Sequence, residues 1–284
     1  MAVQATMREA REYGVPTGAL GDADTPRSTP SVELLGYRID QLDLEATAQR
    51  CRDAIVRMGR VHHVSLAAAK AVNARRDRRL AEILGNAELV TADGQSLVWA
   101  SRLLGEPLPG RVPGIDLMLR LLEIAETEGF RVFFLGARPD VLARALTNLR
   151  ARYPRLIIAG SHHGYFDAES CTDVCAEIYQ GRPQILFVAM SSPRKEYWVS
   201  DYGSMLDVEV IVGVGGSLDV LAGVVRRAPR WIQRAGLEWA FRLLQEPRRL
   251  WRRYLFTNAR FIGIVAAALA RRAIGRLGFQ RRGL

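Results

Sequence analysis

Cysteine and lysine are scarce in this sequence of 284 residues. Of the three cysteines, Cys171 and Cys175 lie one helical turn apart and Cys51 stands alone. This number and spacing argue against a disulfide framework or a zinc site, so we expect buried thiols in a reducing compartment. Lysine occurs only at Lys70 and Lys195, whereas the chain has 40 basic residues in total. Arginine therefore supplies nearly all of its positive charge.

Long apolar runs are absent as well. No uninterrupted apolar stretch approaches the ~20 residues that a membrane-spanning helix needs. The N-terminal residues have no apolar core after their charges, so we expect no signal peptide. The sequence therefore predicts a soluble or peripheral protein.

Acidic residues are scarce near the C-terminus. From Arg226 onward there are 15 arginines, no lysine, and only Glu238 and Glu246 as acids. This segment has a formal charge of +13. Because the whole chain has a formal charge of +10, the first 225 residues have −3. A basic segment on a nearly neutral body is expected to seek an anionic surface such as phospholipid, a lipid diphosphate or nucleic acid. No recognised nucleic-acid-binding motif is present, so we expect no nucleic acid partner.

The organisation along the chain predicts an α/β protein. Residues 1–32 are rich in Gly, Pro, Ser, Thr and Asp and indicate a flexible leader. Residues 33–225 alternate short apolar runs with helical patterns, which is typical of a Rossmann-like, mostly parallel sheet flanked by helices. Residues 226–284 form a basic helical appendage. Expected strands are 61–66, 88–91, 131–135, 156–159, 185–190 and 208–212, and expected helices are 68–84, 95–103, 139–152, 171–179, 196–206 and 238–245.

Glycine-rich or polar loops follow most of the expected strands. In sheets of this kind, ligands bind at the carboxyl ends of the strands. The loop Gly213–Gly216 precedes an expected helix and offers backbone N–H groups to phosphate, although a tight turn without a ligand explains it equally well. Asp219 suits contact with a ribose or base edge, or capping of that helix. Gly136 and Tyr165 lie in two further loops at the same edge.

Three charged residues in these loops are candidates for chemistry. Asp93 ends an expected strand and suits a general base, or an N-cap for the helix that follows. Arg111 and Lys195 suit stabilisation of a negatively charged leaving group, or are solvated surface charges. The histidine pairs His62-His63 and His162-His163 are adjacent in the chain, so their side chains point to opposite faces of a strand and chelation of a metal ion is not expected.

The C-terminal appendage divides at Pro247, which is well placed to begin a helix. After it, one stripe at helical spacing is apolar and the opposite face is basic. Such a helix suits a membrane interface, and packing on the body of the protein is the alternative. The stripe consists of Trp251, Tyr254, Leu255, Phe261, Ile262 and Val265, and the basic face of Arg249, Arg253 and Arg260.

Four segments together resemble the WecG/TagA/CpsF glycosyltransferases (glycosyltransferase family 26). They are VTADGQSLVWASRLLGEPLPGRVPGIDLM, HHGYFD, SSPRKEYW and the block from GVGGSLDVLAG to LWRRYL, in consistent order between about Glu33 and Phe261. The resemblance implies a Rossmann-like domain with a basic appendage that docks on the inner face of the cytoplasmic membrane. It also implies inverting, metal-independent transfer from a UDP-sugar to a polyprenyl-diphosphate-linked sugar, in exopolysaccharide or cell-wall polymer synthesis.

The resemblance also assigns roles to residues. Asp93 matches the presumed base, and Arg111 matches the Arg of an R-V-x-G stretch. Lys195 replaces the Gln of a Pro-Lys-Gln-Glu loop, and Ser65-Leu66-Ala67 stands where members often have Thr-x-Asn. Both departures border the expected sugar pocket and leave open whether the donor sugar is glucose, N-acetylmannosamine or a uronic acid. The nucleotide-sugar site is predicted to comprise Ser65, Gly136, Tyr165, Gly213, Gly215, Gly216 and Asp219, and the acceptor or membrane contacts Arg242, Arg249, Arg253 and Arg260.

Cofactors and alternatives complete the prediction. The only Asp-x-Asp triplet, Asp22–Asp24, lies in the leader, which favours a mechanism without a metal ion or other cofactor. A dinucleotide-dependent oxidoreductase would need an acidic residue about 20 positions after the glycine loop, where residues 226–234 are basic. A non-catalytic membrane-peripheral scaffold would tolerate replacement of Asp93, Arg111 and Lys195. A homo-oligomer is compatible with all of these.

Overall fold

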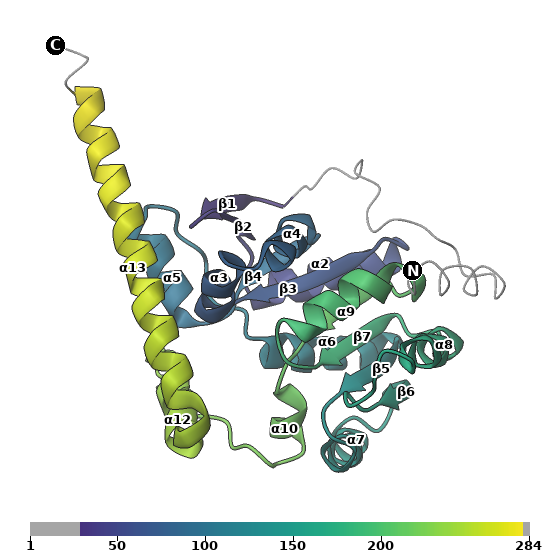
Figure 1. Cartoon of the computed structure of the whole chain (residues 1–284). Helices are drawn as coiled ribbons and strands as arrows, with labels where there is room; N and C mark the ends of the chain where they lie inside the picture. The colour runs from purple at the N-terminus through teal and green to yellow at the C-terminus, as the bar shows by residue number, and fades with distance from the viewer. Residues whose placement is uncertain (1–28, 281–284) are drawn as a thin grey trace.

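Six short apolar segments form one parallel β-sheet at the centre of the structure (Figure 1). The computed structural model describes residues 29–280. The strand order is β4-β3-β8-β7-β5-β6, and every neighbouring pair is parallel. All residues of β3, β4 and β7 are buried, as expected for strands covered on both faces. The strands are β3 (Val61–Leu66), β4 (Leu89–Ala92), β5 (Arg131–Gly136), β6 (Ile157–His162), β7 (Ile185–Ala189) and β8 (Val210–Gly213).

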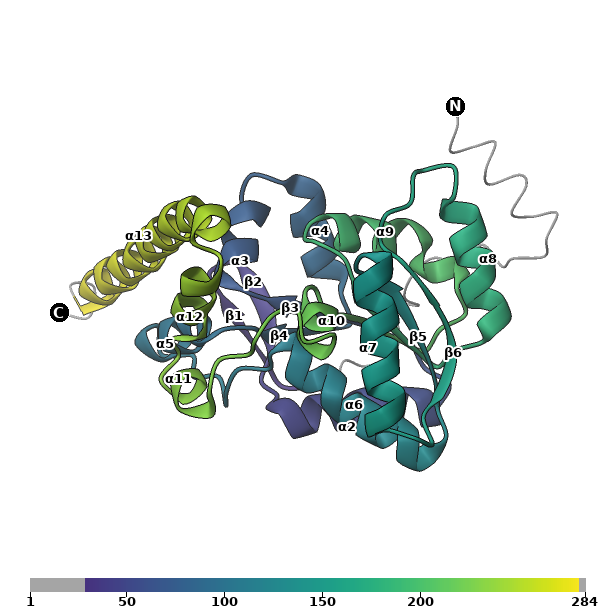
Figure 2. The same ribbon diagram turned by 90° about the horizontal axis from the view of Figure 1, so that it is seen from below.

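Helices cover both faces of this sheet (Figures 1 and 2). Alternate residues of a strand point to opposite faces, and β5 divides accordingly: Val132 and Phe134 pack in one core, and Phe133 and Leu135 in another. The first face is covered by α2 (Leu44–Val56), α6 (Gly114–Glu128), α7 (Pro139–Arg152) and α10 (Ser217–Leu221). The second is covered by α3 (Ala68–Ala74), α4 (Arg78–Asn86), α5 (Gln95–Leu103), α8 (Cys171–Gly181) and α9 (Arg194–Tyr202). The prediction of a Rossmann-like α/β fold is confirmed.

Several elements differ from the sequence prediction: α2 and α6 were not expected, and the helix expected over 196–206 ends at Tyr202. The single helix expected over 68–84 is two helices, α3 and α4, because the side chain of Asp77 accepts a hydrogen bond from the Leu80 amide and caps a new helix. An antiparallel hairpin of β1 (Ser31–Leu34) and β2 (Tyr37–Asp40), not predicted, packs beside β4. The three cysteines are free and buried, as expected.

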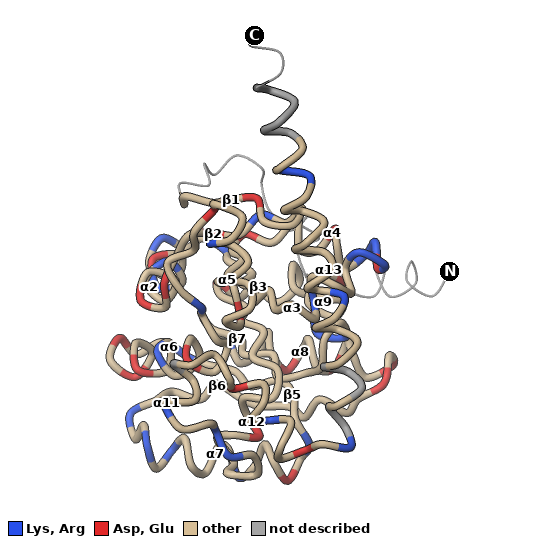
Figure 3. The backbone as a smooth tube through the Cα atoms, turned by 90° about the vertical axis from the view of Figure 1, so that its left-hand side faces the viewer, with Lys and Arg blue, Asp and Glu red and all other residues tan. Residues whose placement is uncertain are grey.

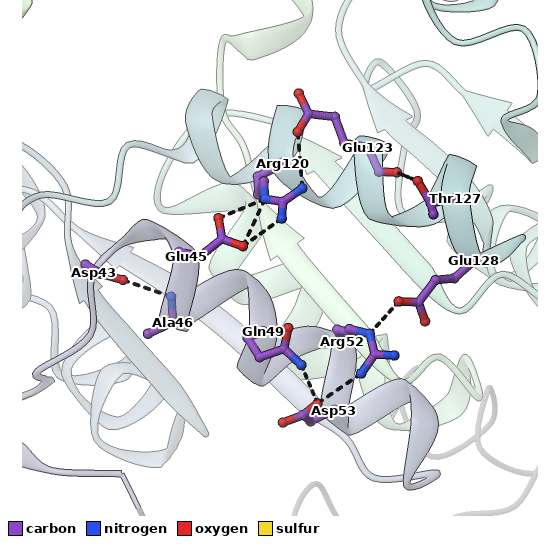
Figure 4. A network of polar contacts seen from close by, with 10 residues as sticks. All are labelled: Asp43, Glu45, Ala46, Gln49, Arg52, Asp53, Arg120, Glu123, Thr127 and Glu128. Atoms are coloured by element: carbon purple, nitrogen blue, oxygen red, sulfur yellow. Dashed lines mark hydrogen bonds and ion pairs between the residues drawn. The ribbon is translucent and has the colours of Figure 1, made fainter.

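Helices α2 and α6 lie side by side and are joined by ion pairs (Figure 4). Arg120 of α6 donates to Glu45 of α2 at 2.7 Å, and Arg52 of α2 donates to Glu128 of α6 at 2.5 Å. These pairs are partly exposed to solvent, so each contributes little to stability. The stability of this layer comes instead from the apolar residues beneath them, such as Leu121 and Ala48.

The C-terminal segment consists of α11 (Arg230–Arg234), α12 (Glu238–Gln245) and the long helix α13 (Pro247–Gln280). Helix α13 lies against α3 and extends beyond the body of the protein (Figure 1). The predicted apolar stripe is divided: Phe261 and Val265 are buried in the core around α3, whereas Trp251, Leu255 and Ile262 are exposed. Packing on the body therefore accounts for one part of the stripe only.

Nothing in the described part of the chain is both long enough and apolar enough to be a membrane-spanning helix.

Candidate active site

The candidate site lies at the edge of the sheet where the chain leaves two neighbouring strands toward opposite faces. Strand β3 continues into α3 on one face, and its neighbour β8 continues into α10 on the other. The carboxyl edge at such a switch point is where doubly wound sheets bind ligands. Ser65 lies near the end of β3 and Gly213 at the end of β8. Asp93 follows β4, and Lys195 lies in the first turn of α9, which follows β7.

Asp93 is held at this edge by its backbone. Its amide donates to the Leu66 carbonyl at 2.7 Å, so it continues the pairing of β4 with β3. The N-cap of α5 is Gly94 (φ +107°), and no side chain caps that helix. The capping role considered for Asp93 is therefore wrong, and its half-buried carboxyl group is available for chemistry.

Charged groups surround the Asp93 carboxyl. Burial raises its pKa, and the positive charge of Lys70 opposes that effect most strongly. Glu238 raises the pKa further, and Arg242 and Arg111 lower it. The net shift is upward, so this carboxylate is a stronger base than an exposed aspartate.

Lys195 belongs to a buried charge cluster that the sequence did not predict. Its ammonium group lies 2.6 Å from Glu196 Oε1, and the Lys70 ammonium lies 2.8 Å from the same oxygen. Lys70 also donates to the Ser65 carbonyl at 2.5 Å. All three charged side chains are about nine-tenths buried or more, so a solvated surface role for Lys195 is wrong. The other oxygen of Glu196 is buried without a hydrogen-bond partner in the described part of the chain.

A rare residue type was the signal that could have found this cluster. Both lysines of the chain converge on one carboxylate. His62 lies in the same charged surroundings, but burial lowers its pKa to about 4 and it is neutral at pH 7. Neither Lys70, Glu196 nor His62 belongs to the predicted site.

Arg111 links the body to the C-terminal segment. Its guanidinium donates to Glu238 of α12 at 2.7 Å and to the Gln233 carbonyl at 3.3 Å. Arg227 lies 3.9 Å from Glu238 and 2.6 Å from Asp116 at the start of α6. Arg111 and Glu238, the first residue of α12, are close enough to Asp93 for their charges to shift its pKa. Figure 3 shows the charged residues around α11 and α12.

The glycine loop turns directly from β8 into α10. Gly215 has φ +53°, and the Ser217 hydroxyl donates to the Val214 carbonyl at 2.6 Å. Asp219 lies in the first turn of this five-residue helix, next to Gly216. A Cβ atom on Gly213 would lie 2.7 Å from Lys195 Cε, so this glycine makes room for the lysine side chain.

Gly136 and Tyr165 lie farther along the same edge. Gly136 has φ +133°, and a Cβ atom there would lie 2.4 Å from the Ala189 carbonyl oxygen. Tyr165 is exposed and lines an open pocket with Arg138, Pro139 and Asp140. Arg194 donates to the Phe166 carbonyl at 2.8 Å, which brings the loop of Tyr165 back to the start of α9. Asp93 and Tyr165 thus lie at opposite ends of this edge, after the outermost strands β4 and β6.

The predicted acceptor arginines lie in the C-terminal helices. Arg242 on α12 and Arg260 on α13 are exposed, and Arg242 acts on the pKa of Asp93. Arg249 and Arg253 lie in α13, and their side chains fall outside the described part of the structure. Within residues 29–280, no three His, Cys, Asp or Glu side chains gather as a metal site would require.

Comparison with known proteins gives consistent matches. A sequence model described as the glycosyl transferase WecG/TagA/CpsF family matches residues 32–274. The chain is similar to the N-acetylglucosaminyldiphosphoundecaprenol N-acetyl-beta-D-mannosaminyltransferase of Staphylococcus aureus strain MW2, with 39% identity over 171 residues, 60% of this chain and 66% of that protein. The protein of the same name from Bacillus spizizenii is 38% identical over 177 residues, 62% of this chain and 68% of that protein. The chain thus spans about two thirds of the length of these relatives.

Proposed function

The chain belongs to the glycosyl transferase WecG/TagA/CpsF family, and on this premise we propose that it transfers a sugar from a UDP-sugar to a polyprenyl-diphosphate-linked acceptor sugar. The relatives bear names that specify an undecaprenyl-diphosphate-linked N-acetylglucosamine acceptor and an N-acetylmannosaminyl group. The observation that carries the proposal is Asp93, a half-buried carboxylate beside the switch point of the sheet, whose pKa is lowered by Lys70, Arg242 and Arg111.

The proposed reaction is a single displacement with Asp93 as general base. The acceptor hydroxyl oxygen forms a bond to the anomeric carbon while the bond from that carbon to the UDP oxygen breaks. The proton of the acceptor hydroxyl passes to the Asp93 carboxylate. One displacement inverts the configuration at the anomeric carbon. The raised pKa of Asp93 suits a group that must accept a proton.

The departing UDP gains negative charge, which Arg111 and Lys195 are proposed to stabilise. Both are fixed in place, Arg111 by Glu238 and Lys195 by Glu196. A fixed cation needs little reorganisation as charge develops, so side chains supply here what a metal ion supplies in other transferases. The nucleotide and sugar are proposed to lie along the edge formed by Ser65, Gly136, Tyr165, Gly213, Gly215, Gly216 and Asp219.

The C-terminal helices are proposed to bind the acceptor diphosphate and the inner face of the cytoplasmic membrane. Exposed apolar side chains gather on these helices, among them Trp231, Trp239, Leu244 and Leu255. Exposed arginines lie on the same segment, including Arg242 and Arg260. Aromatic residues beside arginines suit the boundary between lipid headgroups and acyl chains.

The test is UDP release from a panel of UDP-sugars, with a short-chain polyprenyl-diphosphate-linked N-acetylglucosamine as acceptor and EDTA present. We expect release that depends on the acceptor for one donor, with UDP-N-acetylmannosamine, UDP-glucose and a UDP-uronic acid tested first. If the folded protein releases no UDP with any donor, also after Mg²⁺ or Mn²⁺ is restored, the proposal is contradicted and the alternative of a non-catalytic scaffold is favoured.

A further inference from the structure

Lys70 and Lys195 are fixed on either side of the end of β8. Lys70 comes from α3, and Lys195 and Glu196 come from the first turn of α9. Glu196 Oε1 accepts both ammonium groups, at 2.8 and 2.6 Å. The aliphatic part of Lys195 passes over Gly213, where a Cβ atom would lie 2.7 Å from Cε. One carboxylate therefore holds the two lysines of this chain together across the switch point.

Lys70 is tied to the same strand ends as Asp93. The Ser65 carbonyl accepts from the Lys70 ammonium at 2.5 Å, and the next carbonyl, of Leu66, accepts from the Asp93 amide at 2.7 Å. Adjacent peptide groups at the end of β3 thus position the ammonium and the carboxylate. This accounts for the charge interaction by which Lys70 lowers the pKa of Asp93.

The choice of lysine at these two buried positions has a physical reason. A lysine ammonium is a compact point charge on a flexible chain, and burial can depress its pKa, whereas an arginine stays charged. Burial and the charge of Lys195 lower the pKa of Lys70 to about 8, although Glu196 and Asp93 favour its charged form. Lys70 is therefore charged at pH 7 and loses its charge as the pH rises through about 8.

An ionised Asp93 offsets positive charge of the lysine cluster. The two lysines and Glu196 by themselves carry one surplus positive charge in a buried region, and the charge of Asp93 favours the charged form of Lys70. His62 and His63 beside the cluster are neutral, because burial lowers their pKa values to about 4 and about 3. From α12 and the loop before α6, Glu238 opposes the ionisation of Asp93, and Arg242 and Arg111 favour it.

We propose that Lys70, anchored by Glu196 and the Ser65 carbonyl, is a positioning residue that keeps Asp93 ionised as the base for sugar transfer. The inference rests on the proposed function, because it assigns Lys70 a task in that reaction. It also has a second consequence. When Asp93 takes up the acceptor proton, the cluster is left with one uncompensated positive charge, at the moment when the departing UDP becomes negative.

The test is the pH profile of kcat/KM for the wild type, Lys70→Met and Lys70→Arg. In the wild type we expect an acid limb where Asp93 becomes protonated, and an alkaline limb near pH 8 where Lys70 loses the positive charge that favours departure of UDP. Lys70→Met should move the acid limb upward by about one pH unit or more, because Asp93 loses the positive charge that lowers its pKa most strongly. Lys70→Arg should leave the acid limb in place and abolish the alkaline limb, because arginine does not titrate in this range.

A second variant guards against misfolding of these proteins. In Lys195→Gln the Lys70 ammonium loses its like-charged neighbour, so the alkaline limb should move above pH 8. An acid limb in folded Lys70→Met that coincides with that of the wild type would overturn the proposal. So would an alkaline limb that persists in folded Lys70→Arg.

The same inference can be measured without turnover. In protein labelled with ¹³C at aspartate carboxyl groups, the Asp93 signal is identified by its loss in Asp93→Asn, and its titration is followed in the wild type and Lys70→Met. An upward shift in Lys70→Met supports the inference even if no donor is transferred, and an unchanged titration refutes it even if transfer is observed. Failure of the proposed function is thereby distinguished from failure of the inference.

Discussion

At the scale of single residues, the site depends on two groups whose pKa values are shifted in opposite directions. Burial raises the pKa of Asp93 and lowers that of Lys70 to about 8. Each group favours the charged form of the other, so neither shift is independent of its neighbour. The predictions at this scale follow from removing one member of the pair.

Removal of the carboxylate should abolish most of the activity. We expect Asp93→Asn to lower kcat by about 10²-fold or more, because the amide cannot accept the acceptor proton. Its melting temperature should fall only moderately, because the asparagine no longer offsets the positive charge of Lys70 but the N-cap of α5 is Gly94 and is unaffected. Steady-state UDP release and thermal melting measure the two quantities. Near-normal turnover would remove Asp93 from the role of base.

Stability and activity should respond to alkaline pH in opposite directions. Between pH 8 and about 10.5 the unfolded chain retains a proton that the folded Lys70 has lost, so the Lys70 contribution to the free energy of unfolding rises with pH. The difference in unfolding free energy between the wild type and Lys70→Met should therefore increase from pH 7.5 to pH 9.5, measured by urea denaturation. Activity of the wild type should fall over the same range. A constant difference would mean that the pKa of Lys70 is not depressed.

At the scale of elements, glycines at two strand ends have different tasks. A Cβ atom at Gly213 would contact the flexible end of Lys195, whereas at Gly136 it would contact the backbone of β7. Gly136 also has φ +133°, a conformation that other residues rarely adopt. The first glycine thus gives space to a side chain, and the second allows two strands to approach.

Alanine at these positions should separate activity from stability. Gly213→Ala should displace the Lys195 ammonium and lower kcat severalfold, with a change in unfolding free energy of about 1 kcal/mol or less. Gly136→Ala should destabilise the fold by about 2 kcal/mol or more. Urea denaturation and UDP release on both variants provide the comparison. Equal destabilisation by the two substitutions would show that Gly213 is needed for the backbone as well.

Elements formed by local patterns were predictable from the sequence, and contacts between distant residues were not. The strand predicted over Val61–Leu66 has the same bounds as β3. All six of its residues are buried, so the local pattern was sufficient to predict it. The break between α3 and α4 depends on Asp77 as a cap, which competes with a helical pattern on both sides. Lys70 and Glu196 are 126 positions apart and meet only because α3 and α9 begin at the same edge of the sheet. The periodicity of the sequence contains no information about contacts between residues so far apart in the chain.

At the scale of the whole molecule, charge and exposed apolar surface are concentrated in the C-terminal helices. The ion pair between Arg111 and Glu238 joins α12 to the body, and Phe261 and Val265 join α13 to it. The described remainder of these helices presents exposed arginines, such as Arg242 and Arg260, and exposed aromatic side chains, such as Trp239 and Trp251. The proposed membrane contact belongs to this surface and not to the sheet.

Binding to anionic vesicles tests that contact. We expect the protein to sediment with phosphatidylglycerol vesicles, less at high salt, and much less with phosphatidylcholine alone. The double variant Arg248→Ser/Arg260→Ser should weaken binding roughly tenfold or more, at about 1 kcal/mol for each arginine near the surface. The matched control Arg78→Ser/Arg144→Ser removes the same charge from exposed positions on α4 and α7. Equal losses in both variants would indicate a response to net charge alone.

The packing of α13 on α3 connects the long C-terminal helix to the helix that carries Lys70. Phe261 and Val265 share a core with Ala71 and Val72, the two residues that follow Lys70 on α3. Any rotation or sliding of α13, such as a bilayer would impose on a helix that protrudes from the body, must therefore be absorbed at this seam or passed on to α3. A displacement of α13 would therefore reach α3 at Ala71, the residue next to Lys70, whose charge acts on Asp93.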